Sequence, residues 1–111
     1  MADKKRTSVK LGDDLPIVED ASGYRTSEVP YRFDIGPHRA MLHVAGITYE
    51  GAKTHGDENY RFGKIENHVN KALVHLFAWL GGDRSEDHLG HAAWRALAAL
   101  EADLVADDPP Q

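Results

Sequence analysis

Histidine is the residue type that first suggests chemistry in this chain. Seven histidines occur among 111 residues, and histidine is both the commonest metal ligand and the side chain that titrates nearest neutral pH. Asp87 and His91 are four residues apart, which on a helix brings them close enough to share a metal ion or a hydrogen bond. In the structural alternative, Asp87 interacts with the helix N-terminus and His91 with a neighbouring helix. The sequence leaves both readings open.

Other histidines flank the same stretch. His68 and His75 are seven residues apart on one flank of an apolar stripe. In the structural alternative, each buries its ring at the edge of the core and leaves a ring nitrogen in contact with water. However, His75 lies within about two turns of its helix end, and Asp87, His88 and His91 begin the next helix. Because these ends are neighbours in an antiparallel hairpin, we expect the four to cluster around one loop, which is typical of a metal site in a bundle.

The spacing of apolar residues predicts two helices before that loop. The first covers residues 37–53, with Pro37 in a first turn that tolerates it. Gly51 and Gly56 bracket its end. The second helix has the clearest stripe and stops at Gly81-Gly82. Its stripe consists of Ile65, Val69, Ala72, Leu73, Leu76 and Leu80.

A third helix is expected to begin after Ser85, a good N-cap, with Glu86 and Asp87 in a first turn that favours acids. Its apolar stripe consists of Leu89, Ala93, Leu97, Leu100 and Leu104. The opposite side carries Asp87, His91, Trp94, Ala98 and Val105. Since a simple surface helix would place lysine and glutamate there, this side is expected to be covered by another chain or a ligand.

These elements predict an all-α fold, a three-helix core with an antiparallel helical hairpin that completes a bundle by oligomerisation. Residues 31–106 would form the helical domain. Residues 1–30 mix charges with turn formers and are expected to be a flexible or extended arm, with Leu15, Ile17 and Val18 docking as a short extended piece. Residues 107–111 would be a disordered tail.

Composition narrows the function classes. The chain is 41% apolar and 28% charged, which is typical of a globular domain. Its net charge of −5 argues against direct binding to nucleic-acid backbones or anionic membranes. The longest uncharged apolar run, residues 72–80, is far shorter than the roughly 20 residues of a membrane span. No signal peptide is expected, and the absence of cysteine favours a cytoplasmic location.

The first helix offers further candidates. Glu50 could supply a hard oxygen ligand for Mg²⁺ or Mn²⁺, and Lys53 could contact a phosphate, although each also suits an ordinary helix surface. The sequence has no Walker loop, no Gly-x-Gly-x-x-Gly, no His-Glu-x-x-His and no nucleophile elbow. An adjacent His-Asp pair is also missing, which disfavours an HD-type phosphohydrolase.

Three segments together resemble a known family. They are Tyr-Glu-Gly-Ala-Lys-Thr-His-Gly-Asp-Glu-Asn-Tyr at 49–60, His-Val-Asn-Lys-Ala-Leu-Val-His-Leu at 68–76, and Ser-Glu-Asp-His-Leu-Gly-His-Ala-Ala-Trp at 85–94. They resemble the phage-associated dATP/dGTP diphosphohydrolase N-terminal domain, which is distantly similar to the all-α MazG-like nucleotide pyrophosphohydrolases. The resemblance covers roughly residues 35–101. It implies hydrolysis of a purine deoxynucleoside triphosphate to monophosphate and pyrophosphate with Mg²⁺ or Mn²⁺.

The resemblance also implies roles for particular residues. The metal ligands would be Glu50, His75, Asp87 and His91, with Asp87 and His91 also catalytic. The nucleotide contacts would be Lys53, Asn59, His68, Asn70 and His88. The implied chemistry is attack of a metal-activated water on the α-phosphorus. The sequence departs from the family pattern at Tyr60, Val74 and Gly82, where relatives often carry Trp, Arg and an acid, and it lacks the Glu-x-x-Glu pairs of MazG-like enzymes.

Two other function classes stay open. The chain could be a non-catalytic helical oligomerisation or adaptor module of phage origin. That hypothesis predicts that Trp79, Trp94 and the alanine face of the third helix are buried between chains, and that the histidines hydrogen-bond to protein. A nucleotide-binding sensor without turnover is the third hypothesis. An enzyme, by contrast, requires that His75, Asp87 and His91 converge within metal-ligand distance. Independently of these hypotheses, a hairpin plus one helix encloses little volume, so a homodimer or tetramer is expected.

Overall fold

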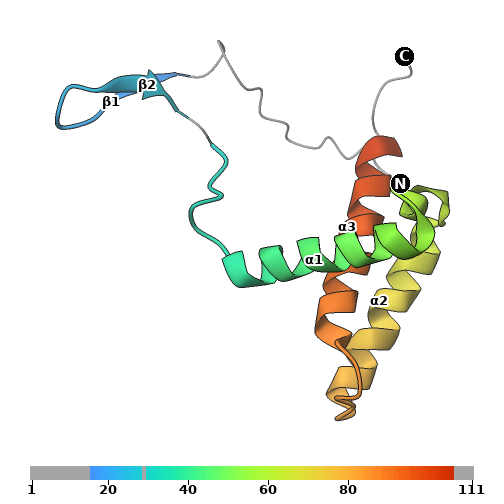
Figure 1. Cartoon of the computed structure of the whole chain (residues 1–111). Helices are drawn as coiled ribbons and strands as arrows, with labels where there is room; N and C mark the ends of the chain where they lie inside the picture. The colour runs from blue at the N-terminus through green and yellow to red at the C-terminus, as the bar shows by residue number, and fades with distance from the viewer. Residues whose placement is uncertain (1–15, 29, 107–111) are drawn as a thin grey trace, which may run out of the picture. The chain divides into compact units, whose positions relative to one another are not determined.

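A computed structural model describes residues 16–28 and 30–106 of the chain (Figure 1). The chain divides after Gly36 into two compact units, and each is described by itself. The predictions for residues 1–15, including the docking of Leu15, and for residues 107–111 lie outside the described residues.

The first unit contains a small antiparallel hairpin. Strand β1 (Ile17–Glu19) pairs with β2 (Arg25–Ser27), with Val18 opposite Thr26. The Asp20 carboxylate begins the turn by accepting hydrogen bonds from the backbone N–H of Ser22 (2.9 Å) and of Tyr24 (3.1 Å). The extended piece expected near Ile17 and Val18 is therefore one strand of a two-stranded ribbon.

The second unit is helical. It consists of α1 (His38–His55), a short 3₁₀ helix η1 (Asn59–Phe62), α2 (Ile65–Leu80) and α3 (His88–Ala106). The predicted all-α class and the antiparallel α2–α3 hairpin are confirmed (Figure 1). α1 extends two residues beyond its predicted end because Gly56, at φ 90°, is the first residue with a conformation that ends the helix.

The start of α3 differs from the prediction that Ser85 caps it. The helix begins at His88, and Asp87 is its N-cap, because one carboxylate oxygen of Asp87 accepts a hydrogen bond from the Gly90 backbone N–H at 3.0 Å. Ser85 is used earlier in the loop, where its N–H donates to the Asp83 carboxylate at 2.8 Å. Asp83 thereby forms a local turn that delays the helix.

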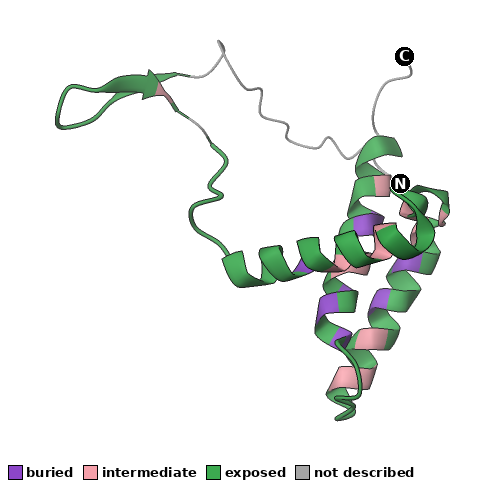
Figure 2. Ribbon diagram, viewed as in Figure 1, coloured by how far each residue is buried: buried purple, intermediate pink, exposed green. Residues whose placement is uncertain are grey.

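The buried positions of the hairpin (purple in Figure 2) differ from the predicted apolar stripes, of which Ala72 is buried and the leucines are exposed. The contact surfaces consist of small residues and histidine, namely His68 and Ala72 on α2 and His88, Gly90, Ala92, Ala98 and Ala99 on α3. Small side chains let two helices approach closely, so the larger leucines are displaced to the flanks. Leu73 and Leu97 remain 45% and 54% exposed.

α1 covers part of the side of α3 that was expected to face another chain or a ligand, while His91 and Val105 on that side are exposed. The Trp94 indole N–H donates to the Thr48 hydroxyl at 3.0 Å, and Ala98 is buried. Ala92, Ala98 and Ala99 are thus buried within a single chain, whereas Ala93 of the same helix is exposed. Burial between chains stays a prediction of the adaptor hypothesis. None of the helices in the described part of the chain combines the length and apolar character that a membrane span needs.

Candidate metal centre

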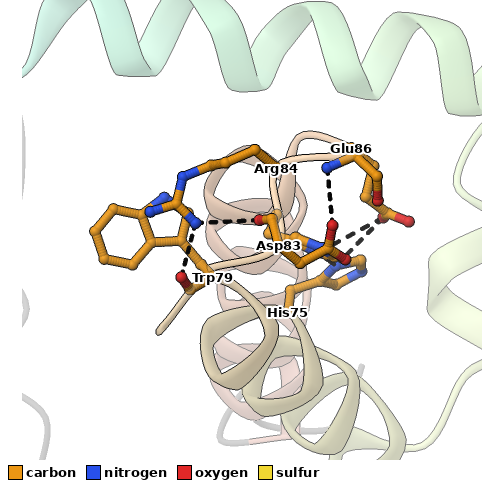
Figure 3. Close-up of polar contacts among 7 residues, drawn as sticks. His75, Trp79, Asp83, Arg84 and Glu86 are labelled. Carbon is orange, nitrogen blue, oxygen red and sulfur yellow. Dashed lines mark hydrogen bonds and ion pairs between the residues drawn. The ribbon is translucent and has the colours of Figure 1, made fainter. Parts of the chain in front are cut away.

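Two imidazoles and a carboxylate converge at the end of the α2–α3 hairpin where the loop joins the two helices (Figure 3). His75 comes from the last two turns of α2, and its Nδ1 lies 2.9 Å from Nδ1 of His88, the first residue of α3. A carboxylate oxygen of Glu86 lies 3.5 Å from the first nitrogen and 3.8 Å from the second. Among the described residues, this is the one group of three potential ligands whose atoms all lie within 4.8 Å of one another.

Asp83 orients the His88 ring through the nitrogen that faces away from His75. The Nε2–H of His88 donates to the Asp83 carboxylate at 2.8 Å, which leaves Nδ1 of the neutral ring without a proton. Hydrogen bonds from Ser85 and from His88 hold the pKa of Asp83 far below its usual range. A carboxylate behind an imidazole is the arrangement that fixes the tautomer of metal-binding histidines. His88 itself is only 6% exposed.

The donor set fits a divalent transition metal. In the structure, the Nδ1–H of His75 donates to the unprotonated Nδ1 of His88. If the proton of His75 were on Nε2 instead, two unprotonated nitrogens would face one point. Burial lowers the pKa of His75, which favours the neutral form that a metal requires. The nitrogens are separated by 2.9 Å, close to the roughly 3 Å between adjacent ligands that each lie about 2.1 Å from a metal.

His91 lies beside this group but is not one of its converging ligands. Its ring stacks on that of His75, with centroids 5.4 Å apart and planes inclined by 24°. The side chain is exposed. Neither ring nitrogen accepts or donates a hydrogen bond within residues 16–28 and 30–106. The structure thus brings His75, His88 and His91 together, and His91 is the member open to solvent.

Asp87 is held by other partners. One of its oxygens lies 2.5 Å from Nε2 of His43 on α1, and the other accepts the Gly90 N–H at 3.0 Å. The hydrogen bond from His43 lowers the pKa of Asp87 below its ordinary value. Asp87 therefore links α1 to the start of α3 and caps that helix, as the structural reading supposed, and it does so next to the three clustered histidines.

The remaining predicted residues lie in several places. On α1, Glu50 and Lys53 pair with each other at 3.3 Å, and the Lys53 ammonium lies over the Tyr49 ring. Asn70 is exposed on α2. Asn59 begins η1 and lines a cavity of about 740 Å³.

His68, a predicted nucleotide contact, is 2% exposed and uses both ring nitrogens within the protein. Nε2 donates to the Tyr60 carbonyl at 2.9 Å, and Nδ1 accepts from Arg95 at 3.0 Å. No ring nitrogen of His68 is left for a ligand.

Three functional side chains were missed by the sequence analysis: Asp83, Glu86 and His43. For Asp83 and Glu86 a signal existed, since both lie in the short loop between the two helices whose histidines were expected to meet. For His43 no signal was available, because its position on α1 depends on how that helix crosses the hairpin.

A helical hairpin that joins two imidazoles and a carboxylate, with a second carboxylate behind one ring, defines a small helical protein with a candidate metal centre. The chain belongs to the dATP/dGTP diphosphohydrolase, N-terminal family, whose pattern matches residues 20–108. No curated protein and no solved structure matches the chain.

Proposed function

We propose that this protein is a metal-dependent nucleotide pyrophosphohydrolase that converts purine deoxynucleoside triphosphates to monophosphates and pyrophosphate. The observation that carries the proposal is the convergence of His75, Glu86 and His88, with Asp83 behind His88. Membership of the dATP/dGTP diphosphohydrolase, N-terminal family supports the substrate class.

The ligand set refines the choice of metal. Mg²⁺ prefers oxygen ligands in an octahedral shell, whereas two imidazoles and one carboxylate suit Mn²⁺ and other transition metals better. His75, Glu86 and His88 would hold the ion, in place of the set that includes Glu50 and Asp87. When bound, the ion supplies charge neutralisation on the phosphates and lowers the pKa of a coordinated water.

Each neighbouring side chain has a proposed role in the reaction. A bond forms between water oxygen and the α-phosphorus, the bond from that phosphorus to the α,β-bridging oxygen breaks, and pyrophosphate leaves. His91 is placed to take the proton of the attacking water because its ring nitrogens are open and its ring stacks on His75. Asp87, whose carboxylate is held by His43 and by the Gly90 N–H, would keep the start of α3, and with it His91, in position.

Pyrophosphate release tests the proposal directly. Purified protein is incubated with each of the four dNTPs and Mn²⁺ or Mg²⁺. Glu86→Gln is compared with Glu66→Gln, a change of the same type on the exposed first turn of α2. We expect release from dATP and dGTP, a fall of roughly tenfold or more for Glu86→Gln, and wild-type rates for Glu66→Gln. No metal-dependent release with any dNTP would refute the enzyme function.

The exposed leucines favour a second copy of the chain as a partner, in keeping with the predicted homodimer or tetramer. Val69, Leu73, Leu76 and Leu80 lie along one flank of α2 and are 40–72% exposed in a single chain. The same observation supports the adaptor function as the second candidate, now through the leucine flank. Binding of dNTPs without pyrophosphate release would instead favour the sensor. The cytoplasmic location and phage origin stay predictions.

A further inference from the structure

A cavity of about 740 Å³ lies where the end of α1, η1 and the middle of the hairpin meet. Its volume is within the range of about 300–1,000 Å³ that is typical of small-molecule sites. We infer that this cavity holds the base and sugar of a purine deoxynucleotide whose phosphates extend along the hairpin toward the metal centre. The inference rests on the proposed function and names the subsite that would recognise the nucleoside.

Aromatic rings supply the surface that a base needs. Tyr60, Phe62 and Trp94 line the cavity, and the Tyr60 and Trp94 rings meet edge to face with centroids 6.0 Å apart. The Trp94 indole N–H is already bonded to Thr48, so its ring is held in place. Phe62, at the end of η1, lines the cavity and is 89% exposed, so its ring is accessible to a ligand. A purine ring stacks well on such surfaces.

The cavity has an acidic residue at its α1 end and two basic residues on its hairpin side, which matches the base and the phosphates of a nucleotide. Asp57 lies in the loop after α1, and its carboxylate could accept hydrogen bonds from the amino or imino groups of a purine. Lys71 and Arg95 line the hairpin side of the cavity. Within the part of the chain that the structure describes, the Lys71 ammonium has neither an ion pair nor a hydrogen bond. Arg95 uses one of its N–H groups on His68, which leaves others for an anion.

Helix geometry connects this cavity to the metal centre. Lys71 lies four residues before His75 on α2, and Arg95 lies four residues after His91 on α3. Residues four apart are neighbours on a helix surface, so both cations lie one turn from the clustered histidines. A nucleotide with its base in the cavity would therefore have cations beside its phosphates as they approach His75 and His91.

Tryptophan fluorescence provides a test that does not depend on turnover. In a Trp79→Phe background, Trp94 is the only remaining tryptophan of the two in the chain. The protein is titrated with deoxyadenosine, dAMP and dATP in the presence of EDTA, with excitation at the red edge of tryptophan absorption. We expect saturable quenching with all three ligands. Phe62→Ala should weaken binding of all three by roughly fivefold or more, and Lys71→Ala should weaken dAMP and dATP but not deoxyadenosine.

Phe77→Ala and Lys64→Ala are the matched controls, because both residues are exposed on or beside α2 and neither lines the cavity. Absence of any Trp94 response, or equal effects of Phe62→Ala and Phe77→Ala, would overturn the inference. An equal loss for nucleoside and nucleotide in Lys71→Ala would overturn the proposed orientation. Binding at Trp94 without pyrophosphate release would refute only the proposed activity, whereas release with an unresponsive Trp94 would refute only this subsite.

Discussion

At the residue scale, the two buried histidines use their ring nitrogens in different ways. His68 donates to a backbone carbonyl and accepts from Arg95, so both of its ring nitrogens are bonded within the protein. His88 spends one nitrogen on Asp83 and turns the other toward His75 and Glu86. A histidine whose two ring nitrogens both bond to the protein is structural, whereas one with a nitrogen facing other potential ligands is a candidate metal ligand. The sequence alone does not show which partners each ring has.

His68→Ala should destabilise the protein by about 2–4 kcal/mol, because it opens a cavity and leaves the Tyr60 carbonyl and Arg95 without a partner. Asn70→Ala, an exposed change two residues away on α2, should alter the free energy of unfolding by less than about 0.5 kcal/mol. Urea denaturation followed by circular dichroism measures both. Equal stabilities for the two variants would show that His68 does not join η1 to the hairpin as described.

At the element scale, the start of α3 combines a helix cap with the candidate metal ligands. Asp87 caps the helix, and the loop before it carries Asp83 and Glu86. The hairpin, its glycine stop and the meeting of histidines from its two helices could be predicted from apolar periodicity and turn residues. The loop position of the carboxylates was a usable signal, but helical spacing could not assign their roles, because local turns such as that of Asp83 determine where loop side chains point.

The same limit applies to the core. Apolar periodicity located the helices correctly and included the buried Ala72, but it also predicted buried leucines, which are exposed because close helix approach through Ala92 and Ala99 displaces larger side chains. Hydrophobicity ranks leucine above alanine and histidine, so a pattern based on it selects the leucine flank. Only the helix separation, which is a tertiary property, decides between the two faces.

Gly90→Ala tests the capping geometry of α3. A Cβ at this position would lie 2.1 Å from a carboxylate oxygen of Asp87, so the cap and its contact with His43 would have to move. Gly46→Ala on α1 is the matched control, because a Cβ there meets nothing within 4 Å and should stabilise the helix. We expect Gly90→Ala to be less stable than Gly46→Ala by about 1–2 kcal/mol in thermal or urea unfolding. A Gly90→Ala variant as stable as the control would contradict the assignment of Asp87 as N-cap.

At the scale of the whole molecule, a single chain leaves much of its apolar surface uncovered. The exposed flank of α2 is large enough to suggest an interface, since monomers rarely expose a continuous apolar stripe along a helix. If the flank pairs with a second copy, Leu73→Lys with Leu76→Lys should convert an oligomer to a monomer. Leu42→Lys, on the exposed side of α1 at 77% exposure, should leave the assembly unchanged.

Sedimentation equilibrium distinguishes these outcomes over a range of protein concentrations. A wild-type chain that is monomeric at every concentration would rule out self-association, and so would a double variant that sediments like the wild type. Circular dichroism of each variant serves as the folding control, because an unfolded variant would also sediment as a monomer without testing the interface.

Manganese binding, followed by the electron paramagnetic resonance signal of the free ion, tests the central claim most directly. The wild type should bind one Mn²⁺ per chain. Glu86→Gln should bind it at least tenfold more weakly, and Asp83→Asn, which removes the carboxylate that orients His88, should weaken it by about 10–100-fold. Glu66→Gln should match the wild type. Saturable binding that is unchanged by Glu86→Gln and Asp83→Asn, or no binding at all, would contradict a metal centre at the end of the α2–α3 hairpin.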